Sequence, residues 1–173
     1  MHGIILTADG VDDREFLYSY YRLREEDVTV DVAAPEAGPI RGVYGCPMEA
    51  NLSYFDMWGA DYYEVAIIPG GSKASETVRQ SGRVQELIRK MVASDKIVAA
   101  IGHGVEALVT TEVIKGRCAT CAPGLWDELE LVGSQCCDQP AVTDGTLVTS
   151  RGADDLPCFG VAIIDLLHKR NEK

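Results

Sequence analysis

Hydrophobic and polar residues follow two rhythms along this chain, one typical of buried strands and the other of amphipathic helices. Short, largely apolar runs at 3–7, 28–34, 65–68 and 97–101 predict strands. Between the first two runs and between the last two, apolar residues recur at helical spacing, namely Phe16, Leu17, Tyr20, Tyr21 and Leu23, then Val84, Leu87, Ile88, Met91 and Val92. This alternation predicts an α/β fold with a mostly parallel sheet and helices on both faces, of the flavodoxin-like, doubly wound type.

The remaining segments extend this pattern towards the C-terminus. Residues 35–56, interrupted by several Gly and Pro residues, predict a small hairpin excursion. Further predicted elements are a helix from the turn at Gly102 to about Val113, a strand over 118–121, a hairpin of 140–143 and 146–150 around Asp144-Gly145, and a last helix over about 158–168.

Length and charge restrict the classes of protein that fit. The chain has 173 residues, of which 46% are hydrophobic, so we expect one core and a single domain spanning 1–173. A net charge of −11 argues against non-specific nucleic-acid binding, which needs a basic face. The longest apolar runs are far below the roughly 18 residues that span a bilayer, so we expect no membrane segment and, by default, a cytoplasmic location.

The chain contains six cysteines, and Cys118 and Cys121 match the C-x-x-C spacing of some metal sites. On a strand, however, that spacing directs the two sulfur atoms to opposite faces, so one metal ion could not easily collect both. We therefore predict no metal site and expect packed, reduced thiols. The adjacent Cys136 and Cys137 would be redox-sensitive if exposed.

The richest chemistry is predicted where the strand at 97–101 runs into Gly102, His103 and Gly104. A sharp strand-to-helix turn holds its central residue over the carboxyl ends of the strands, where Cys or Ser can act as a nucleophile. Gly102 accepts the same backbone angles but has no atom that could attack a substrate. Asp9-Gly10 and Gly70-Gly71 also follow predicted strands, so we expect them to converge on this turn.

Several motifs together resemble the DJ-1/ThiJ/PfpI superfamily and, within it, the PfpI-like branch. They are Thr7-Ala8-Asp9-Gly10 with Glu15, Tyr20-Tyr21-Arg22-Leu23, Ala33-Ala34-Pro35-Glu36, Ile68-Pro69-Gly70-Gly71, Ala100-Ile101-Gly102-His103-Gly104, and Thr149-Ser150-Arg151-Gly152-Ala153-Asp154-Asp155-Leu156-Pro157. The resemblance covers nearly the whole length. It implies a class I glutamine amidotransferase-like sandwich that uses no metal or organic cofactor and assembles as a homodimer or homohexamer.

The resemblance also assigns site residues. The family's reactive Cys would fall at Gly102, with its His at His103. Glu15 matches a buried acid that contacts the thiolate, and Glu76 matches a Glu that completes a triad across a subunit boundary. The backbone N–H groups of Gly71 and His103 would form an oxyanion hole.

The chain departs from the family pattern at several positions that the resemblance places around one pocket, close to Gly70. In addition to Gly102, Tyr44 stands at a common His, Ala122 at a common Tyr and Trp126 at a common Lys. The resemblance therefore implies a remodelled cavity that has lost a thiol and a phenol.

Each of these residues also has a purely structural interpretation. Glu15 could be a solvated residue on a helix face, and His103 could simply satisfy backbone groups at the turn. Glu76 could stabilise the positive end of a helix that it begins. Trp126 could belong either to the core or to the pocket wall.

Three functional hypotheses follow. In the first, the protein is a divergent or catalytically silent member that binds a small ligand or acts in stress response, because loss of the nucleophile removes covalent catalysis. In the second, Glu15 and His103 act as acid and base in a non-covalent hydratase or lyase. In the third, Gly102 is a substitution in a PfpI-like Cys hydrolase or glyoxalase III-like enzyme. Whether the chain is an enzyme stays open at this point.

Overall fold

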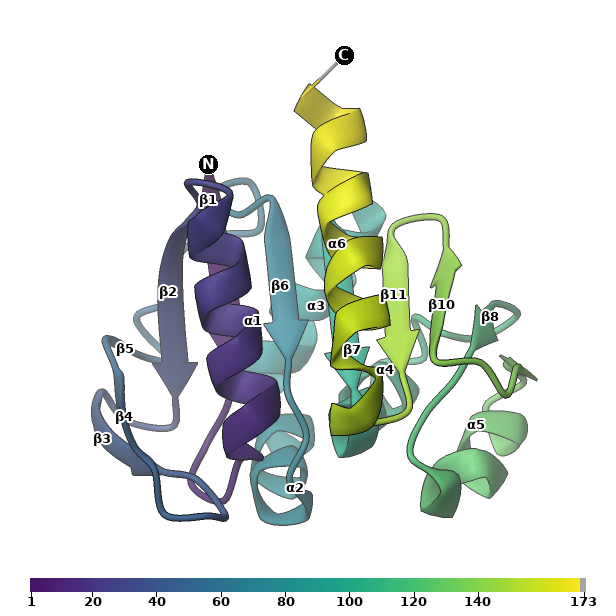
Figure 1. The fold of residues 1–173 in the computed structure, drawn as a ribbon, viewed down its shortest axis with the longest axis horizontal. Helices are drawn as coiled ribbons and strands as arrows, with labels where there is room; N and C mark the ends of the chain where they lie inside the picture. The colour runs from purple at the N-terminus through teal and green to yellow at the C-terminus, as the bar shows by residue number, and fades with distance from the viewer. Residues whose placement is uncertain (172–173) are drawn as a thin grey trace.

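A computed structural model describes residues 1–171 and has a seven-stranded central sheet (Figure 1). The strands run in the order β10-β11-β7-β6-β1-β2-β5. Their bounds are β1 (His2–Leu6), β2 (Thr29–Ala34), β5 (Leu52–Ser53), β6 (Val65–Ile68), β7 (Ile97–Ile101), β10 (Ala141–Asp144) and β11 (Leu147–Ser150). All neighbouring pairs are parallel except β10 and β11. The flavodoxin-like α/β fold expected from the hydrophobic pattern is confirmed.

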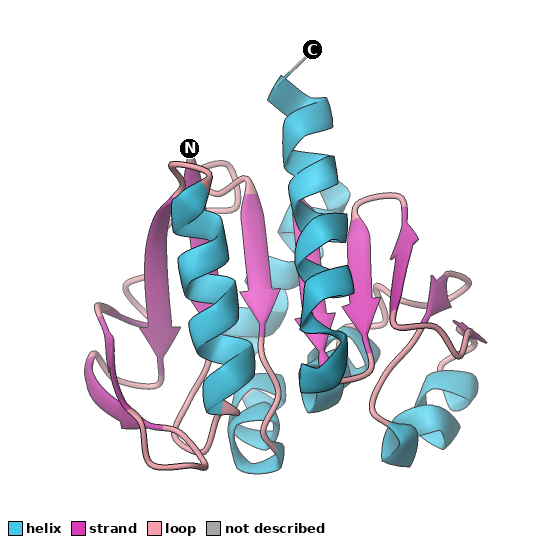
Figure 2. Ribbon diagram, viewed as in Figure 1, coloured by secondary structure: helices cyan, strands magenta, loops and turns pink. Residues whose placement is uncertain are grey.

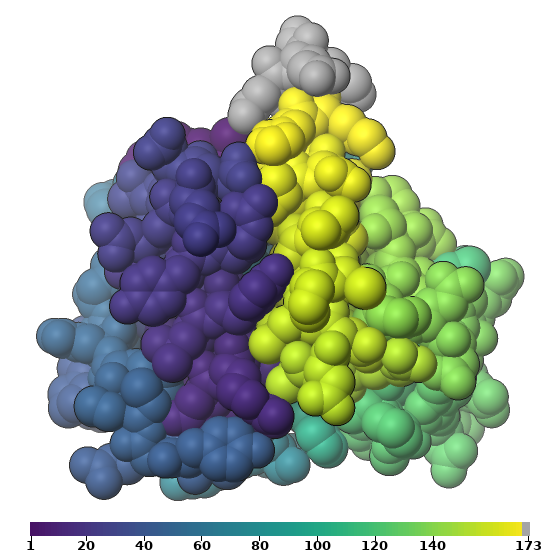
Figure 3. Space-filling model, viewed as in Figure 1, coloured from purple at the N-terminus to yellow at the C-terminus, as the bar shows by residue number. Residues whose placement is uncertain are grey.

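Helices cover both faces of this sheet (Figure 2). One face carries α1 (Asp13–Glu25) and α6 (Leu156–Asn171), which lie side by side on the molecular surface (Figure 3). Behind the sheet lie α3 (Gly82–Ala93) and α4 (Glu106–Thr110), with α2 (Ser72–Gln80) at its lower end (Figure 1). Because strand side chains alternate, Ile4 and Ile5 enter two different buried clusters, one on each face.

Two small two-stranded sheets lie beside the main one. Strands β3 (Gly38–Arg41) and β4 (Pro47–Ala50) pair antiparallel, which confirms the predicted hairpin excursion. Strands β8 (Cys118–Ala119) and β9 (Gln135–Cys136) pair in parallel beside the helix α5 (Trp126–Leu131), which the hydrophobic pattern did not predict. The predicted hairpin at Asp144-Gly145 joins β10 and β11, where Gly145 has a φ of 63°.

Three predicted boundaries were wrong. The helix expected to reach Val113 begins with a 3-10 turn over Gly102–Val105 and ends as α4 at Thr110, because Glu112 adopts a left-handed φ of 59°. The strand expected over 118–121 pairs only at Cys118–Ala119. The last helix is longer than predicted, since a short 3-10 turn over Ala153–Asp155 leads directly into it.

No helix in the described part of the chain is both long enough and apolar enough to cross a membrane. The carboxyl ends of β1, β6 and β7 meet at the lower edge in Figure 1, and the candidate site lies there.

Candidate functional site

Gly102 immediately follows β7 and has the left-handed φ of 58°, which a residue with a side chain adopts only at a cost. A Cβ atom added there would lie 3.1 Å from Oε1 of Glu15. A side chain at position 102 would therefore start directly above this carboxyl group, as the resemblance expects for a nucleophile.

Two neighbouring glycines are required by close backbone packing. A Cβ atom on Gly104 would collide with the carbonyl oxygen of Ile68, and one on Gly71 would collide with that of Gly10. A Cβ atom on Gly70 would lie 3.0 Å from the backbone nitrogen of His103. The Gly70-Gly71 turn and the start of the His103 turn are thus in close proximity, as the predicted oxyanion hole requires.

Glu15 reaches this turn from the first turn of α1. Asp12 caps that helix, since its side chain accepts hydrogen bonds from the backbone N–H groups of Arg14 and Glu15. The Glu15 residue is only 4% exposed, so the solvated-face interpretation is wrong. The backbone N–H of Gly70 donates a 2.6 Å hydrogen bond to its Oε2 atom.

Burial raises the pKa of Glu15 to about 7, although the hydrogen bond from Gly70 acts in the opposite direction. The charge of His103 also lowers it slightly. A carboxyl group with this pKa exchanges its proton near neutral pH, which suits a general acid or base.

The side chain of His103 contacts a residue that the sequence analysis missed. Its Nδ1 atom lies 2.9 Å from Oε1 of Glu106, three residues further on. In turn, Arg79 on α2 donates from Nη1 to Oε2 of Glu106 at 3.0 Å. The signal in the sequence was the His-x-x-Glu spacing, which places both side chains on one side of a helical turn.

Glu76 does not contact His103 within the chain. It is the fifth residue of α2, so the prediction that it begins a helix was wrong. Its exposed carboxylate accepts a hydrogen bond from the side-chain amide of Gln80. Its role across a subunit boundary stays a prediction.

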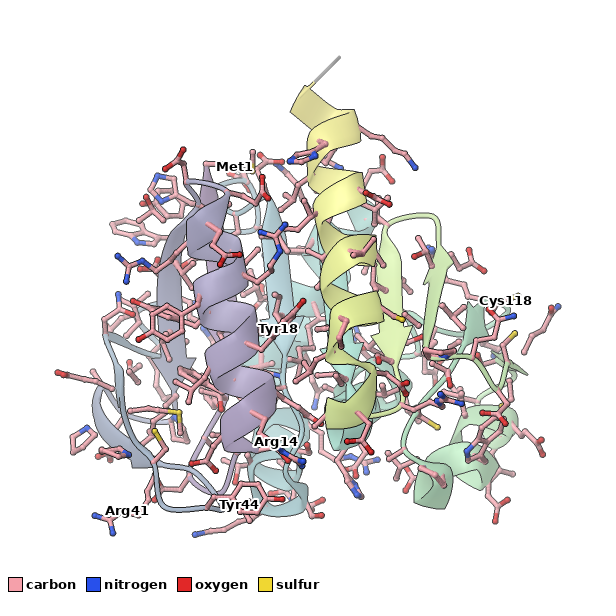
Figure 4. All side chains as sticks on the ribbon, viewed as in Figure 1. Met1, Arg14, Tyr18, Arg41, Tyr44 and Cys118 are labelled. Atoms are coloured by element: carbon pink, nitrogen blue, oxygen red, sulfur yellow. The ribbon has the colours of Figure 1, made fainter. Side chains whose placement is uncertain are left out.

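The loop that carries Tyr44 is fixed by a buried carboxylate. The two oxygen atoms of Asp13 accept hydrogen bonds of 2.8 Å from the backbone N–H groups of Tyr44 and Cys46. The exposed Tyr44 ring lies 5.2 Å from the guanidinium carbon of Arg14, and the two side chains meet at the lower end of α1 (Figure 4). Tyr44 thus lies at the rim of the site.

A groove of about 410 Å³ opens beside Glu15. Its lining includes Arg14, Pro123 and Arg151 with the four residues that follow it, and a Cβ atom on Gly152 would lie 4.0 Å from Oε1 of Glu15. Ala122 and Trp126 are not part of this lining; they pack, half-buried, against the core. The structure therefore favours a core role for Trp126.

Among the described residues, the atoms nearest to a Cβ placed on Gly102 all belong to Glu15 and none to a cysteine. Cys121 is fully buried, and burial raises the pKa of its thiol to about 12. Within residues 1–171, no group of three or more His, Cys, Asp or Glu side chains is arranged to hold a metal ion.

The fold and this turn define an α/β protein with a site at the carboxyl ends of its parallel strands, next to a strand-to-helix turn. Residues 3–166 match the DJ-1/PfpI family, and the chain belongs to that family. It is 37% identical to an uncharacterised protein of Archaeoglobus fulgidus over 98% of this chain and 99% of that protein. It is 35% identical to a deglycase of Pyrococcus horikoshii over 96% of this chain and 99% of the relative.

Solved structures share the same fold. The DJ-1 protein of Schizosaccharomyces pombe superposes with a TM-score of 0.88 at 25% identity, over 96% of this chain and 91% of that one. A two-domain protein of Anabaena variabilis with DJ-1/ThiJ/PfpI-like and ferritin-like domains gives a TM-score of 0.92 at 26% identity. This match covers 96% of the present chain and 48% of the longer one.

Proposed function

We propose that this protein binds a small carbonyl compound at the Gly102 turn without forming a covalent bond to it. The observation that carries the proposal is the backbone of Gly102, which has the left-handed φ of 58° but no side chain above Glu15. The turn keeps the backbone N–H groups of Gly71 and His103, which suit a carbonyl oxygen, while that of Gly70 donates to Glu15. Relatives named as deglycases support a carbonyl-derived ligand class.

Thiol chemistry should be absent because no thiol is available at the turn. Deglycase, peptidase and thiol-dependent glyoxalase activities all need a nucleophile in this position. The buried Cys121 thiol stays protonated at neutral pH, and a protonated thiol is a poor nucleophile.

The test combines binding with a restored nucleophile. In the wild type, pyruvate should shift the amide resonances of Gly70, Gly71 and His103 in an NMR titration, and methylglyoxal should not be consumed above background. The Gly102→Cys variant should gain consumption of methylglyoxal that iodoacetamide abolishes, whereas Gly102→Ser serves as the matched variant without a thiol. Wild-type turnover that iodoacetamide abolishes, or an absence of any shift with pyruvate, would contradict the proposal.

A second function, proton transfer without a covalent intermediate, is favoured by the pKa of Glu15 near 7 and by the contact between His103 and Glu106. One group would remove a proton next to the carbonyl while the other delivers one, as in a hydratase or lyase. Glu15→Gln should abolish such turnover, and retained activity would exclude this mechanism.

The third hypothesis makes a separate prediction. If position 102 is a substitution in a Cys hydrolase or a glyoxalase III-like enzyme, the natural gene should carry a Cys codon at this position, and sequencing that gene would decide it. We also propose a cytoplasmic homodimer or homohexamer, as the resemblance implies, and analytical ultracentrifugation would measure the assembly.

A further inference from the structure

The imidazole of His103 is held from within its own chain. The Nδ1 atom of His103 lies 2.9 Å from Oε1 of Glu106, and the two residues are separated by a single turn of backbone. The Glu106 side chain is only 9% exposed, whereas that of His103 is 38% exposed. Glu106 is therefore largely shielded from solvent, whereas part of the His103 side chain is accessible.

Arg79 fixes the carboxylate of Glu106 from the other side. Its Nη1 atom donates to Oε2 of Glu106 at 3.0 Å, and its Nε atom donates to Oγ1 of Thr110 at 3.0 Å. Its Nη2 atom donates to Glu128 at 3.3 Å. Burial alone would lower the pKa of Arg79, but the hydrogen bonds and charges of Glu106 and Glu128 raise it.

This arrangement determines which nitrogen of the neutral ring carries the proton. Arg79 can only donate hydrogen bonds, so Glu106 remains an acceptor on that side. A carboxylate accepts from Nδ1–H, which leaves Nε2 of the neutral ring without a proton and able to accept one. The structure gives no hydrogen bond from Nε2 to another described residue, so this atom is free for a ligand.

We propose that Glu106, anchored by Arg79, is the positioning residue that holds His103 in its Nδ1–H form, so that the acid–base site is complete within one chain. The proposal rests on the use of His103 in the proposed function. The resemblance assigns such an acid to Glu76 of a neighbouring subunit, and Glu106 would hold the ring without it. Within its own chain, the exposed Glu76 carboxylate accepts a hydrogen bond from Gln80 in the same helix.

The test reads the tautomer directly and does not depend on turnover. Uniformly ¹⁵N-labelled protein is studied by long-range ¹H–¹⁵N NMR at about pH 8.5, roughly two units above the ordinary imidazole pKa. The His103→Gln variant assigns the signal among the three histidines. Wild-type His103 should give the pattern of an Nδ1–H ring.

The variants Glu106→Gln and Glu76→Gln form a matched pair. In Glu106→Gln, the amide oxygen should face Arg79, so that the amide N–H₂ group donates to the ring and the proton moves to Nε2. The His103 pattern should therefore change to Nε2–H. Glu76→Gln should leave it unchanged.

Each outcome of the NMR experiment either supports or overturns the positioning role of Glu106. An Nε2–H pattern in the wild type would overturn the proposal even if Glu106→Gln does not fold. An unchanged pattern in a folded Glu106→Gln variant, or a changed one in Glu76→Gln, would also overturn it. If the tautomer behaves as expected while pyruvate fails to bind, the positioning role stands and the proposed function alone is rejected.

Discussion

The backbone N–H of Gly70 donates a 2.6 Å hydrogen bond to Oε2 of Glu15, joining the first turn of α1 to the turn after β6. This contact holds the carboxyl group in a site where burial raises its pKa from 4.5 to about 7. At pH values between 4.5 and about 7, the Glu15 carboxyl is ionised in the unfolded chain but still protonated in the folded protein. The stability of the folded state should therefore fall as pH rises through this range.

Glu15→Gln should remove that dependence, because the amide is neutral at every pH and its oxygen still accepts from Gly70. Relative to the wild type, the variant should gain up to about 3 kcal/mol in free energy of unfolding between pH 4.5 and pH 7.5. Urea unfolding of both proteins at several pH values measures the difference. A constant difference across this range would show that the Glu15 carboxyl is not perturbed.

Gly102→Ala should destabilise the protein by about 1 to 2 kcal/mol, because a left-handed φ penalises a Cβ atom and this one would press on Glu15. Gly124→Ala is the matched control, since a Cβ atom there meets nothing within 4 Å. Chemical unfolding should show a clear loss only for the first variant. Equal stability of the two variants would contradict the strain inferred at the turn.

Asp13→Ala should loosen the loop that carries Tyr44. The substitution leaves two backbone N–H groups without their acceptor, at a cost of about 2 to 3 kcal/mol. Amide hydrogen exchange should speed up at Tyr44 and Cys46. Asp12→Ala removes the helix cap of α1 and the ion pair with Arg14 but keeps both Asp13 acceptors, so it should leave exchange at these two amides unchanged.

The cysteines should differ sharply in reactivity. Cys158 is exposed and should be alkylated at once by iodoacetamide, whereas Cys121 should react only when the chain unfolds. Burial also raises the pKa of Cys136, so its reaction should be slower than that of Cys158. Peptide mapping by mass spectrometry gives the order, and early labelling of Cys121 would contradict its burial.

Periodicity predicted the sheet and its main helices. Uninterrupted apolar runs are typical of strands that are buried on both faces of the sheet, and apolar residues at helical spacing are typical of a helix with one buried face. The hairpin at Asp144-Gly145 was equally readable, because a two-residue turn needs a left-handed residue. Helix α5 and strand β9 were missed, and strand β8 was predicted too long, because these elements have only 2 to 6 residues. Segments this short carry too few residues to show a period.

Only part of the candidate site was predicted from the sequence. Glu15 and His103 were found through the resemblance, and burial of Glu15 agrees with it. Glu106 was missed because it lies in a short stretch of apolar residues where an acidic side chain looks like surface. Its ion-pair partner Arg79 is 27 residues away in sequence, and a local sequence pattern cannot predict an ion pair over that separation.

The glycines at 71 and 104 cannot be replaced without moving a neighbouring carbonyl group, whereas a side chain at 102 meets only the end of Glu15. Glycine codons GGU and GGC become cysteine codons UGU and UGC by exchange of their first base. Where position 102 is encoded by GGU or GGC, a single-nucleotide change would therefore place a thiol above Glu15 without rebuilding the surrounding architecture.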